Sequence, residues 1–462
     1  MELYDRSSDE WHVLVHVCRR WRYLAFTSPR HLNLQLLCKL PRRSVKQMLD
    51  IWPELPIFME AIRVNGFTME ERDDCIAALR LNHRVSGIHL EGPSDSILKT
   101  FVSRMQRPFP ALTYLWVRPN FSTNAFQNGM SPSFLGGSAP ALRVLVWVWF
   151  PFPTLPELLL STTNLVRLCY DLIPRSGYIS PQAMATALSE LTQLESLSLT
   201  SPFPDWHPAP PGKPIRFPPP HTRTPLPALT HLRFQGDAEY FEDLVAQIDT
   251  PLLESLVVTI FRREVIEVSQ LAKFVRRSDK LSLLDQAEVA FKRDRITLNL
   301  SQELRTIDPK FLRLNLLCHQ WALQLSHLTQ FCESCLPTLS SFETLLIHNP
   351  THYMWRDVID DPDPQWLELL HFFHAVKDLR LSKHVALHIG QILRGLPVER
   401  VSEVLPALET VFITGLESFG PVKEAISAFA DMRRLSGHPL SICDWEEDHD
   451  VLDENFPLFN YK

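Results

Sequence analysis

Apolar side chains recur along this chain in a short phrase whose hydrophobic residues stand at positions i, i+3 and i+5. The phrase Pro-Ala-Leu-x-x-Leu, or a close variant of it, begins at Pro110, Pro140, Pro227, Pro251 and Pro406. The last two apolar residues of each phrase are two apart, so their side chains point to the same face of an extended strand. The pattern therefore predicts a bend followed by a short strand with one buried face.

The apolar triplet also occurs without the full phrase, and its spacing predicts a repeated unit. Successive triplets up to residue 256 are 23 to 35 residues apart. Two weaker candidates, 284–289 and 311–316, fill the longer interval that follows. The middle residues of the clear triplets are Ile88, Leu115, Leu145, Leu168, Leu197, Leu232, Leu256, Leu345, Leu379 and Val411.

Amphipathic segments with helical spacing separate the predicted strands. One strand plus one helix every 23 to 35 residues is typical of leucine-rich repeats. We therefore expect an α/β fold of the leucine-rich-repeat-like solenoid type, with a curved parallel sheet and helices on its outer side. An ordinary α/β domain with parallel strands is the alternative. The expected helices are 94–109, 180–191, 240–248, 267–277, 319–336, 364–375, 384–393 and 422–435.

Composition marks two segments that interrupt the repeats. Residues 201–227 contain eleven prolines, which predicts a loop or polyproline II insertion rather than a helix or a central strand. Residues 444–462 begin with an acidic run and predict a solvated tail. The expected organisation is a helical segment at 1–40, an irregular leucine-rich-repeat-like domain at 41–443 that holds the insertion, and the acidic tail.

Residues 8–28 predict a helix before the first repeat. Ser8 is a suitable N-cap, and the arginines of the segment fall mostly off the apolar face. One interpretation is an N-terminal cap, which solenoid proteins need to cover the first repeat. The apolar face consists of Leu14, Val17, Cys18, Trp21, Leu24 and Ala25.

The same segment resembles the second half of an F-box. The string 17–25 (VCRRWRYLA), with Trp11 before it and 29–34 after it, is similar to the F-box-like proteins of mushroom-forming fungi. Further segments, such as 48–57 and 176–184, resemble the same proteins along essentially the whole chain. The sequence departs from the family in one respect. An F-box normally begins with a helix that contains Leu-Pro, and no such helix precedes Trp11.

The resemblance implies a substrate-recognition subunit of a Skp–cullin–F-box ubiquitin ligase, located in the cytoplasm or the nucleus. Its partners would be a Skp-type adaptor of the cullin–RING ligase and a target protein. The alternative is a leucine-rich-repeat scaffold without a ligase role, in which the F-box remnant acts only as an N-terminal cap. The residues that would contact the adaptor are Trp11, Val15, Cys18, Trp21 and Leu24.

The net charge and the sequence motifs argue against several other classes of function. The net charge of −7 disfavours a general nucleic-acid binder, and the apolar run 144–150 is far too short to cross a bilayer. The sequence has no GxSxG, P-loop or GxGxxG motif, so we expect no enzyme activity and no cofactor. Cys332 and Cys335 form a CxxC pair, but they lie on a predicted helix without a second pair, so no metal site is expected.

The remaining candidate site is the exposed face of the predicted sheet. Aromatic and arginine side chains between the core leucines are typical of binding hot spots. The partner-binding residues predicted in this way are Tyr114, Trp116, Arg118, Arg143, Arg167, Tyr170, His231, Arg233, Lys377 and Arg380.

Overall fold

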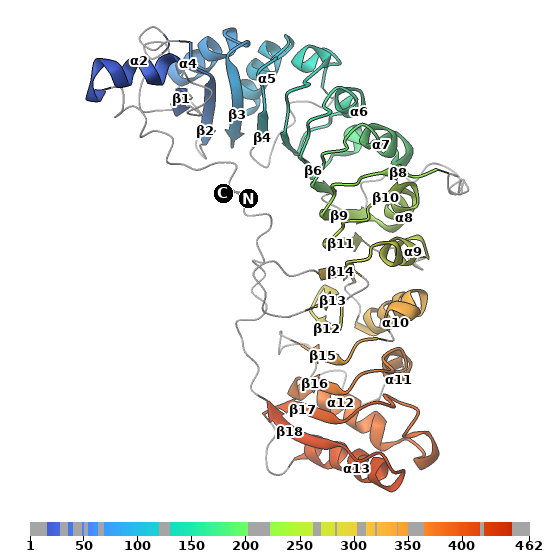
Figure 1. Cartoon of the computed structure of the whole chain (residues 1–462). Helices are drawn as coiled ribbons and strands as arrows, with labels where there is room; N and C mark the ends of the chain where they lie inside the picture. Colours follow the sequence, from blue (N-terminus) through green and yellow to red (C-terminus); the bar gives the residue numbers. More distant parts are fainter. Residues whose placement is uncertain are drawn as a thin grey trace. The chain divides into compact units, whose positions relative to one another are not determined.

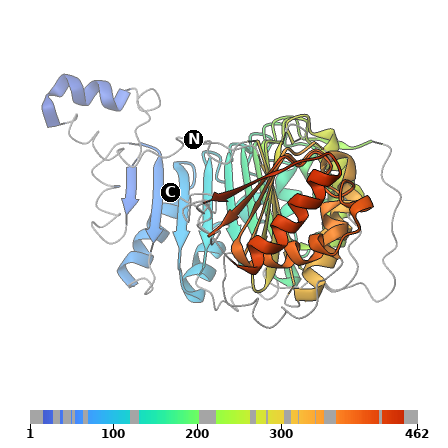
Figure 2. The same cartoon turned by 90° about the horizontal axis from the view of Figure 1, so that it is seen from below.

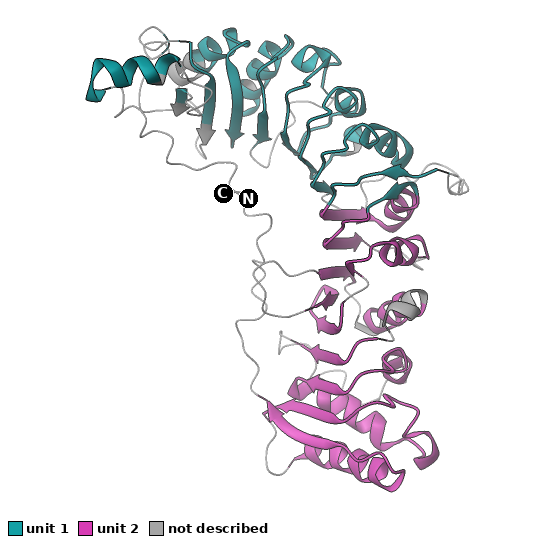
Figure 3. Cartoon of the chain, in the orientation of Figure 1, with its two compact units in different colours: residues 1–229, 247–250 teal, residues 230–246, 251–462 magenta. Residues whose placement is uncertain are grey.

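The chain is an α/β protein with a large, mostly parallel sheet in which strands alternate with helices (Figure 1). Its contacts divide it into two compact units (Figure 3). Unit 1 holds residues 1–229 and 247–250, and unit 2 holds 230–246 and 251–462. The computed structural model describes residues 16–27, 36–39, 49, 54–62, 69–119, 130–201, 222–261, 269–281, 284–302, 311–318, 321–339, 341–349, 365–415 and 420–445.

Unit 1 has seven described strands in this sheet, all parallel and in chain order. Figure 2 shows the first of them, in blue to cyan, running in the same direction. A separate parallel pair joins β8 (Thr224–Pro225) to β10 (Ile248–Asp249). The seven strands are β1 (Leu36–Lys39), β2 (Ile57–Ile62), β3 (Val85–Glu91), β4 (Tyr114–Arg118), β5 (Val144–Val148), β6 (Arg167–Asp171) and β7 (Ser196–Thr200).

The middle residues of the repeated triplets form one row across these strands. Ile88 pairs in register with Leu115, and the row continues through Leu145, Leu168 and Leu197. All five side chains are fully buried. Burial of a side chain of this size contributes roughly 1.5–3 kcal/mol, so the row is a main source of stability. The triplet prediction is confirmed for this part of the chain.

The helices of unit 1 follow the strands along the chain, and α4 to α7 lie on one side of them (Figure 1). Ser180, the first residue of the predicted helix 180–191, is the N-cap of α7, because its side-chain oxygen accepts a hydrogen bond from the backbone N–H of Ala183 at 3.2 Å. The helical elements are α2 (Arg19–Thr27), α4 (Met69–Arg80), α5 (Asp95–Arg104), η2 (Phe134–Gly137), α6 (Leu155–Leu159), η3 (Arg175–Gly177) and α7 (Pro181–Leu188).

Unit 2 has nine described strands, in the spatial order β9-β11-β14-β13-β12-β15-β16-β17-β18. They are β9 (His231–Asp237), β11 (Ser255–Phe261), β12 (Gln286–Phe291), β13 (Arg295–Ser301), β14 (Phe311–Leu317), β15 (Thr344–His348), β16 (Asp378–Leu381), β17 (Thr410–Thr414) and β18 (Ser441–Trp445). The helical elements are α8 (Ala238–Gln247), α9 (Ser269–Arg277), α10 (Trp321–Leu339), α11 (Gln365–Leu370), α12 (Lys383–Arg394), η5 (Val398–Arg400) and α13 (Pro421–Leu435).

Strands β12, β13 and β14 interrupt the chain order of the sheet. The predicted triplets at 284–289 and 311–316 do become strands, β12 and β14, but β13 lies between them and is antiparallel to both. As a result β11 pairs with β14, and β12 pairs with β15. A solenoid with one strand per repeat would keep the strands in sequence, so the fold departs from the expected pattern here.

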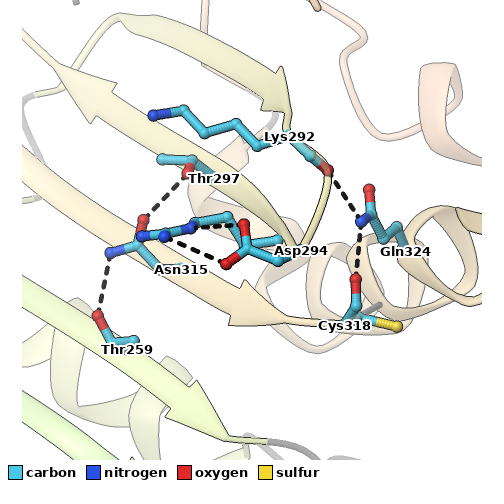
Figure 4. Close-up of polar contacts among 8 residues, drawn as sticks. Thr259, Lys292, Asp294, Thr297, Asn315, Cys318 and Gln324 are labelled. Carbon is cyan, nitrogen blue, oxygen red and sulfur yellow. Dashed lines mark hydrogen bonds and ion pairs between the residues drawn. The ribbon is translucent and has the colours of Figure 1, made fainter. Parts of the chain in front are cut away.

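Gln324 on α10 holds the ends of this antiparallel insert together (Figure 4). Its side-chain nitrogen donates to the carbonyl of Lys292 at 3.1 Å and to that of Cys318 at 2.8 Å. Lys292 follows β12 and Cys318 follows β14. Because Gln324 is buried, these two bonds satisfy carbonyls that water cannot reach easily.

The expected helices agree with the structure in position, with differences at the ends. The largest differences are at 94–109, where α5 ends at Arg104, and at 364–375, where α11 ends at Leu370. Of the predicted insertion, 202–221 lies outside the described residues, and Thr224–Pro225 forms the short strand β8 instead of a loop. Of the predicted tail, Asp444 and Trp445 belong to β18, and 446–462 lie outside the described residues.

Candidate binding surfaces on the sheet

Side chains alternate between two faces along each strand. We call the side opposite the described helices the far face, and it is the place where an exposed binding surface was expected. The register between neighbouring strands assigns each residue to a face. Of the ten residues predicted for the partner-binding surface, those on the far face are Tyr114, Trp116, Arg118, Arg167, His231, Arg233 and Arg380.

Tyr170 is on the opposite face, in the core, so its assignment to the binding surface was wrong. It alternates with Cys169 and Asp171 and is only 1% exposed. Its hydroxyl accepts a hydrogen bond from the N–H of Phe152 at 2.9 Å and donates to the carbonyl of Gly177 at 3.1 Å. Burial raises the pKa of Tyr170 above its ordinary value, while the bond from Phe152 opposes the rise.

We expect Tyr170→Phe to lower the free energy of unfolding by about 1–3 kcal/mol, because the buried N–H of Phe152 loses its acceptor. Gly177 packs closely against this hydroxyl, since a Cβ at position 177 would lie 2.6 Å from the tyrosine oxygen. Urea denaturation would measure the loss. Tyr23→Phe is the matched control, since Tyr23 is 68% exposed. An equal loss in both variants would contradict the assignment.

Arg143 and Lys377 do not belong to the strands. Each directly precedes one, and both side chains are exposed. The Lys377 Nζ lies 2.9 Å from the Glu343 carboxylate, and this hydrogen bond raises the pKa of Lys377. Lys377 already has an acidic partner within the chain, so it is a weaker candidate for binding another protein.

A row of rings crosses the far face of unit 1. Ring centroids are 5.6 Å apart between Phe58 and Tyr114, 6.2 Å between His89 and Tyr114, and 5.0 Å between His89 and Trp116. Burial raises the pKa of Tyr114; nearby Arg167 opposes the rise, while two neighbouring glutamates add to it. Aromatic rings at these separations attract one another, so the row contributes to the packing of this face.

Trp116 lies within an apolar cluster and is not solvent-facing as the sequence suggested. It is 4% exposed and packs with side chains of β5 and β6. Trp149 and Leu172 close the cluster from positions with φ of 70° and 55°, a region that non-glycine residues rarely adopt. The centre of this face is therefore packed structure. The cluster consists of Trp116, Val144, Val146, Val148 and Cys169.

Asp171 joins two strands on the same face. Its carboxylate accepts hydrogen bonds from the Cys169 thiol at 3.0 Å and from the Ser198 hydroxyl at 2.8 Å. Asp171 is buried, and the two donors offset part of the cost of removing its charge from water. A carboxylate beside a thiol disfavours the thiolate, so this pair is not arranged for nucleophilic catalysis.

The far face of unit 2 contains a buried polar network. The Glu288 carboxylate on β12 lies 2.9 Å from the Nε2 atom of His348 on β15, and it accepts a bond from the Asn299 amide at 3.1 Å. All three side chains are buried. Arg313 on β14 is paired in register with Asn299. Burial lowers the pKa of Arg313, and attraction to Glu288 opposes the shift.

A second ladder of hydrogen bonds runs beside this network (Figure 4). The hydroxyl of Thr297 donates to the side-chain oxygen of Asn315 at 3.0 Å, and the Asn315 amide donates to the Thr259 oxygen at 3.1 Å. The three residues belong to β13, β14 and β11. The Thr259 oxygen is the acceptor in this ladder, and among the described residues its hydroxyl donates no hydrogen bond.

None of the network residues is among the site residues predicted from the sequence. Glu288, Asn299 and Arg313 occupy polar positions in segments with alternating pattern, which is the only sequence signal for them. The pairing that brings Glu288 to His348 joins positions 60 residues apart. Local spacing cannot indicate such a contact.

The predicted adaptor-docking residues lie on or before α2. Trp11 and Val15 are outside the described residues. Cys18 precedes α2 and is exposed, and its carbonyl accepts a hydrogen bond from the N–H of Arg22 at 3.1 Å. Trp21 and Leu24, on one face of α2, are 50% and 51% exposed.

Other classes of site find no support in the described part of the chain. Those residues contain no group of three or more potential metal ligands, and no helix among them is long and apolar enough to cross a membrane. The sequence matches no known protein-family model and no curated protein.

Proposed function

We propose that this chain is an F-box-like target-recognition protein. In this proposal α2 docks a Skp-type adaptor of a cullin–RING ubiquitin ligase, and the far face of a leucine-rich-repeat-like solenoid binds the target. No residue of the chain carries out chemistry. The mechanism is tethering, which raises the effective concentration of the target at the site of ubiquitin transfer.

The observation that carries the proposal is the exposure of the apolar face of α2. Trp21 and Leu24 are three residues apart, so they lie next to each other on the helix surface. Half of each side chain is exposed, whereas a helix that only capped the sheet would bury this face. Exposed aromatic and aliphatic side chains of this kind are typical anchors of a protein interface.

Repetition of the strand–helix unit supports the solenoid part of the proposal. The in-register row from Ile88 to Leu197 gives the five strands β3 to β7 the same buried position, as stacked repeats require. In unit 2 the antiparallel insert replaces part of the series, and the row resumes in parallel register from Leu345 through Leu379 to Val411.

Binding of the full chain to a Skp-type adaptor tests the ligase role. We expect Trp21→Ala/Leu24→Ala to weaken the affinity at least tenfold, because truncation of two interface anchors typically costs about 2 kcal/mol or more. Isothermal titration calorimetry would measure the change. Tyr23→Ala is the matched control, since Tyr23 is exposed on the same helix but points away from Trp21 and Leu24.

Two outcomes would reject this role. One is the failure of the unmodified chain to bind the adaptor. The other is an equal loss of affinity in the double variant and in Tyr23→Ala. Either result would favour the alternative function, a scaffold that binds a protein partner through the sheet while α2 has only a structural role.

A further inference from the structure

We infer that the far face of unit 2 recognises an acidic, extended segment of a protein partner through a row of arginines. The inference rests on the proposed function, because it specifies the chemical nature of the target. The row consists of Arg233 on β9, Arg313 on β14 and Arg380 on β16. All three are in unit 2 and are half-buried.

Strand register places the three arginines at the same level of the sheet. Arg233 is in register with Val257 on β11, and Val257 with Arg313. The line continues through Asn299, Glu288 and Leu346 to Arg380. Neighbouring strands are about 4.8 Å apart, so Arg233 and Arg313 are separated by roughly 10 Å and Arg313 and Arg380 by roughly 19 Å.

Two of these arginines have no acidic partner among the residues that the structure describes. Within the described part of the chain, Arg233 makes neither a side-chain hydrogen bond nor an ion pair. Arg380 makes no ion pair there, and its Nε atom is buried without a hydrogen-bond acceptor. A half-buried guanidinium that lacks a counter-charge gains more from an incoming carboxylate than a fully hydrated one does.

Arg380 is also held in a fixed orientation. Its guanidinium carbon lies 5.4 Å from the ring centre of Phe412 and 5.8 Å from that of Trp445. Stacking on aromatic rings limits the motion of the side chain before a ligand binds. Less conformational entropy is then lost on binding, so this arginine is prepared for recognition.

Between Arg233 and Arg313 the surface offers hydrogen-bond donors. Thr259 lies on β11, two residues beyond Val257; its oxygen accepts the bond from Asn315, and a hydroxyl can at the same time donate its hydrogen to a ligand. Burial makes the Arg313 charge costly, and an added anion would reduce that cost. Two guanidinium groups and a hydroxyl donor within about 10 Å match a carboxylate-bearing ligand.

Acidic residues on the same face do not cancel this charge. Glu288 is buried and bound to His348 and Asn299. Asp237 accepts a bond from the N–H of Glu239 at 2.8 Å and so caps α8. Asp378 lies at the start of β16, one level below the arginine row. Arg295 is a further cation on this face, and Asp294 pairs with it at 3.1 Å.

The length of the row sets the size of the partner segment. Arg233 and Arg380 are six strands apart, or roughly 29 Å. An extended chain covers about 3.3 Å per residue, so a segment of about nine residues would contact the whole row. We therefore predict that a peptide of about ten residues with carboxylates at alternate positions binds to this surface.

Fluorescence anisotropy with the full chain tests the inference. The probe is a labelled ten-residue peptide of alternating Glu and Ser, compared with Gln–Ser and Lys–Ser versions. We expect binding of the Glu–Ser peptide alone, a decrease with salt, and a loss of affinity of about tenfold in Arg233→Gln/Arg380→Gln. Arg400→Gln is the matched control, because Arg400 is exposed and paired with Glu403 at 3.2 Å.

Several outcomes would overturn the inference. They are no detectable binding at about 1 mM peptide, equal binding of the Gln–Ser peptide, or an equal loss in Arg400→Gln. Tighter, arginine-dependent binding of a single-stranded RNA oligonucleotide would assign the surface to nucleic acid instead. Arg233→Gln alone is the second variant, since the Arg233 side chain has no hydrogen bond to the described part of the chain and its replacement should leave the fold intact. Adaptor binding through α2 is measured separately, so failure here leaves the ligase role untouched.

Discussion

His348→Leu is expected to lower the free energy of unfolding by about 3–5 kcal/mol, the usual cost of breaking a buried pair on one side. The substitution leaves the Glu288 carboxylate buried without the donor that now lies 2.9 Å away. Of the described residues, the Asn299 amide and the charge of Arg313 would remain to stabilise it. Urea denaturation gives the overall loss, and amide hydrogen exchange in β12 and β15 shows whether it is local.

A second substitution distinguishes the effect of the buried charge on stability from the effect of packing. In His348→Leu/Glu288→Gln the buried group is neutral, yet its amide can still bond to Asn299. We expect the double variant to be more stable than His348→Leu alone, because the unpaired buried charge is gone. If the double variant were the less stable of the two, the unpaired carboxylate would not be the cause of the lower stability of His348→Leu.

Arg433→Met is expected to lower the free energy of unfolding by about 3 kcal/mol, because it removes a buried guanidinium that donates to three backbone carbonyls, and the buried carbonyl of Leu408 loses this donor. Arg433 on α13 is 1% exposed, and burial lowers its pKa. Its guanidinium donates to the carbonyls of Leu405 at 3.3 Å, Pro406 at 3.4 Å and Leu408 at 3.0 Å. These three residues belong to the bend that leads into β17.

The neighbouring residue provides the control. Arg434 is exposed on the same helix, so Arg434→Met should change the melting temperature little. The loss at Arg433 corresponds to a drop of roughly 6–12 °C for a unit of this size. Arg433→Lys should recover only part of it, since one ammonium group cannot reach three carbonyls in a fixed fork. If Arg433→Lys had the melting temperature of the unmodified chain, the positive charge alone would account for the contribution of Arg433 to stability.

The sequence was sufficient to predict most of the strands and helices. Each Pro-Ala-Leu phrase contains its own bend and its own buried side chains within eight residues. Leu112, Leu142, Leu229 and Leu408 are buried as the phrase predicts. Such local patterns predict strands and helices because, in both, apolar side chains recur on the face that is buried in the core and polar ones on the face in water. The parallel α/β architecture follows from the alternation of the two patterns.

The antiparallel insert could not be predicted in this way. Residues 295–301 alternate regularly, which is consistent with a strand, but the pattern does not say on which side of β14 the strand lies. Register depends on contacts between positions far apart in sequence, such as Thr259 and Asn315. The same reason explains why the Glu288–His348 pair was not expected.

The sequence also did not predict correctly which face of the sheet each side chain lies on. Tyr170 and Arg167 looked equally suitable for binding, yet they are three positions apart along β6, an odd number, so Tyr170 lies in the core and Arg167 on the far face. Trp116 has the expected face, but Val146 and Cys169 from the next strands bury it. The amino-acid sequence alone thus determined which segments form strands and helices, because those preferences are local. Only the tertiary structure decided which polar side chains meet, because strand register and packing join residues that lie far apart in the chain.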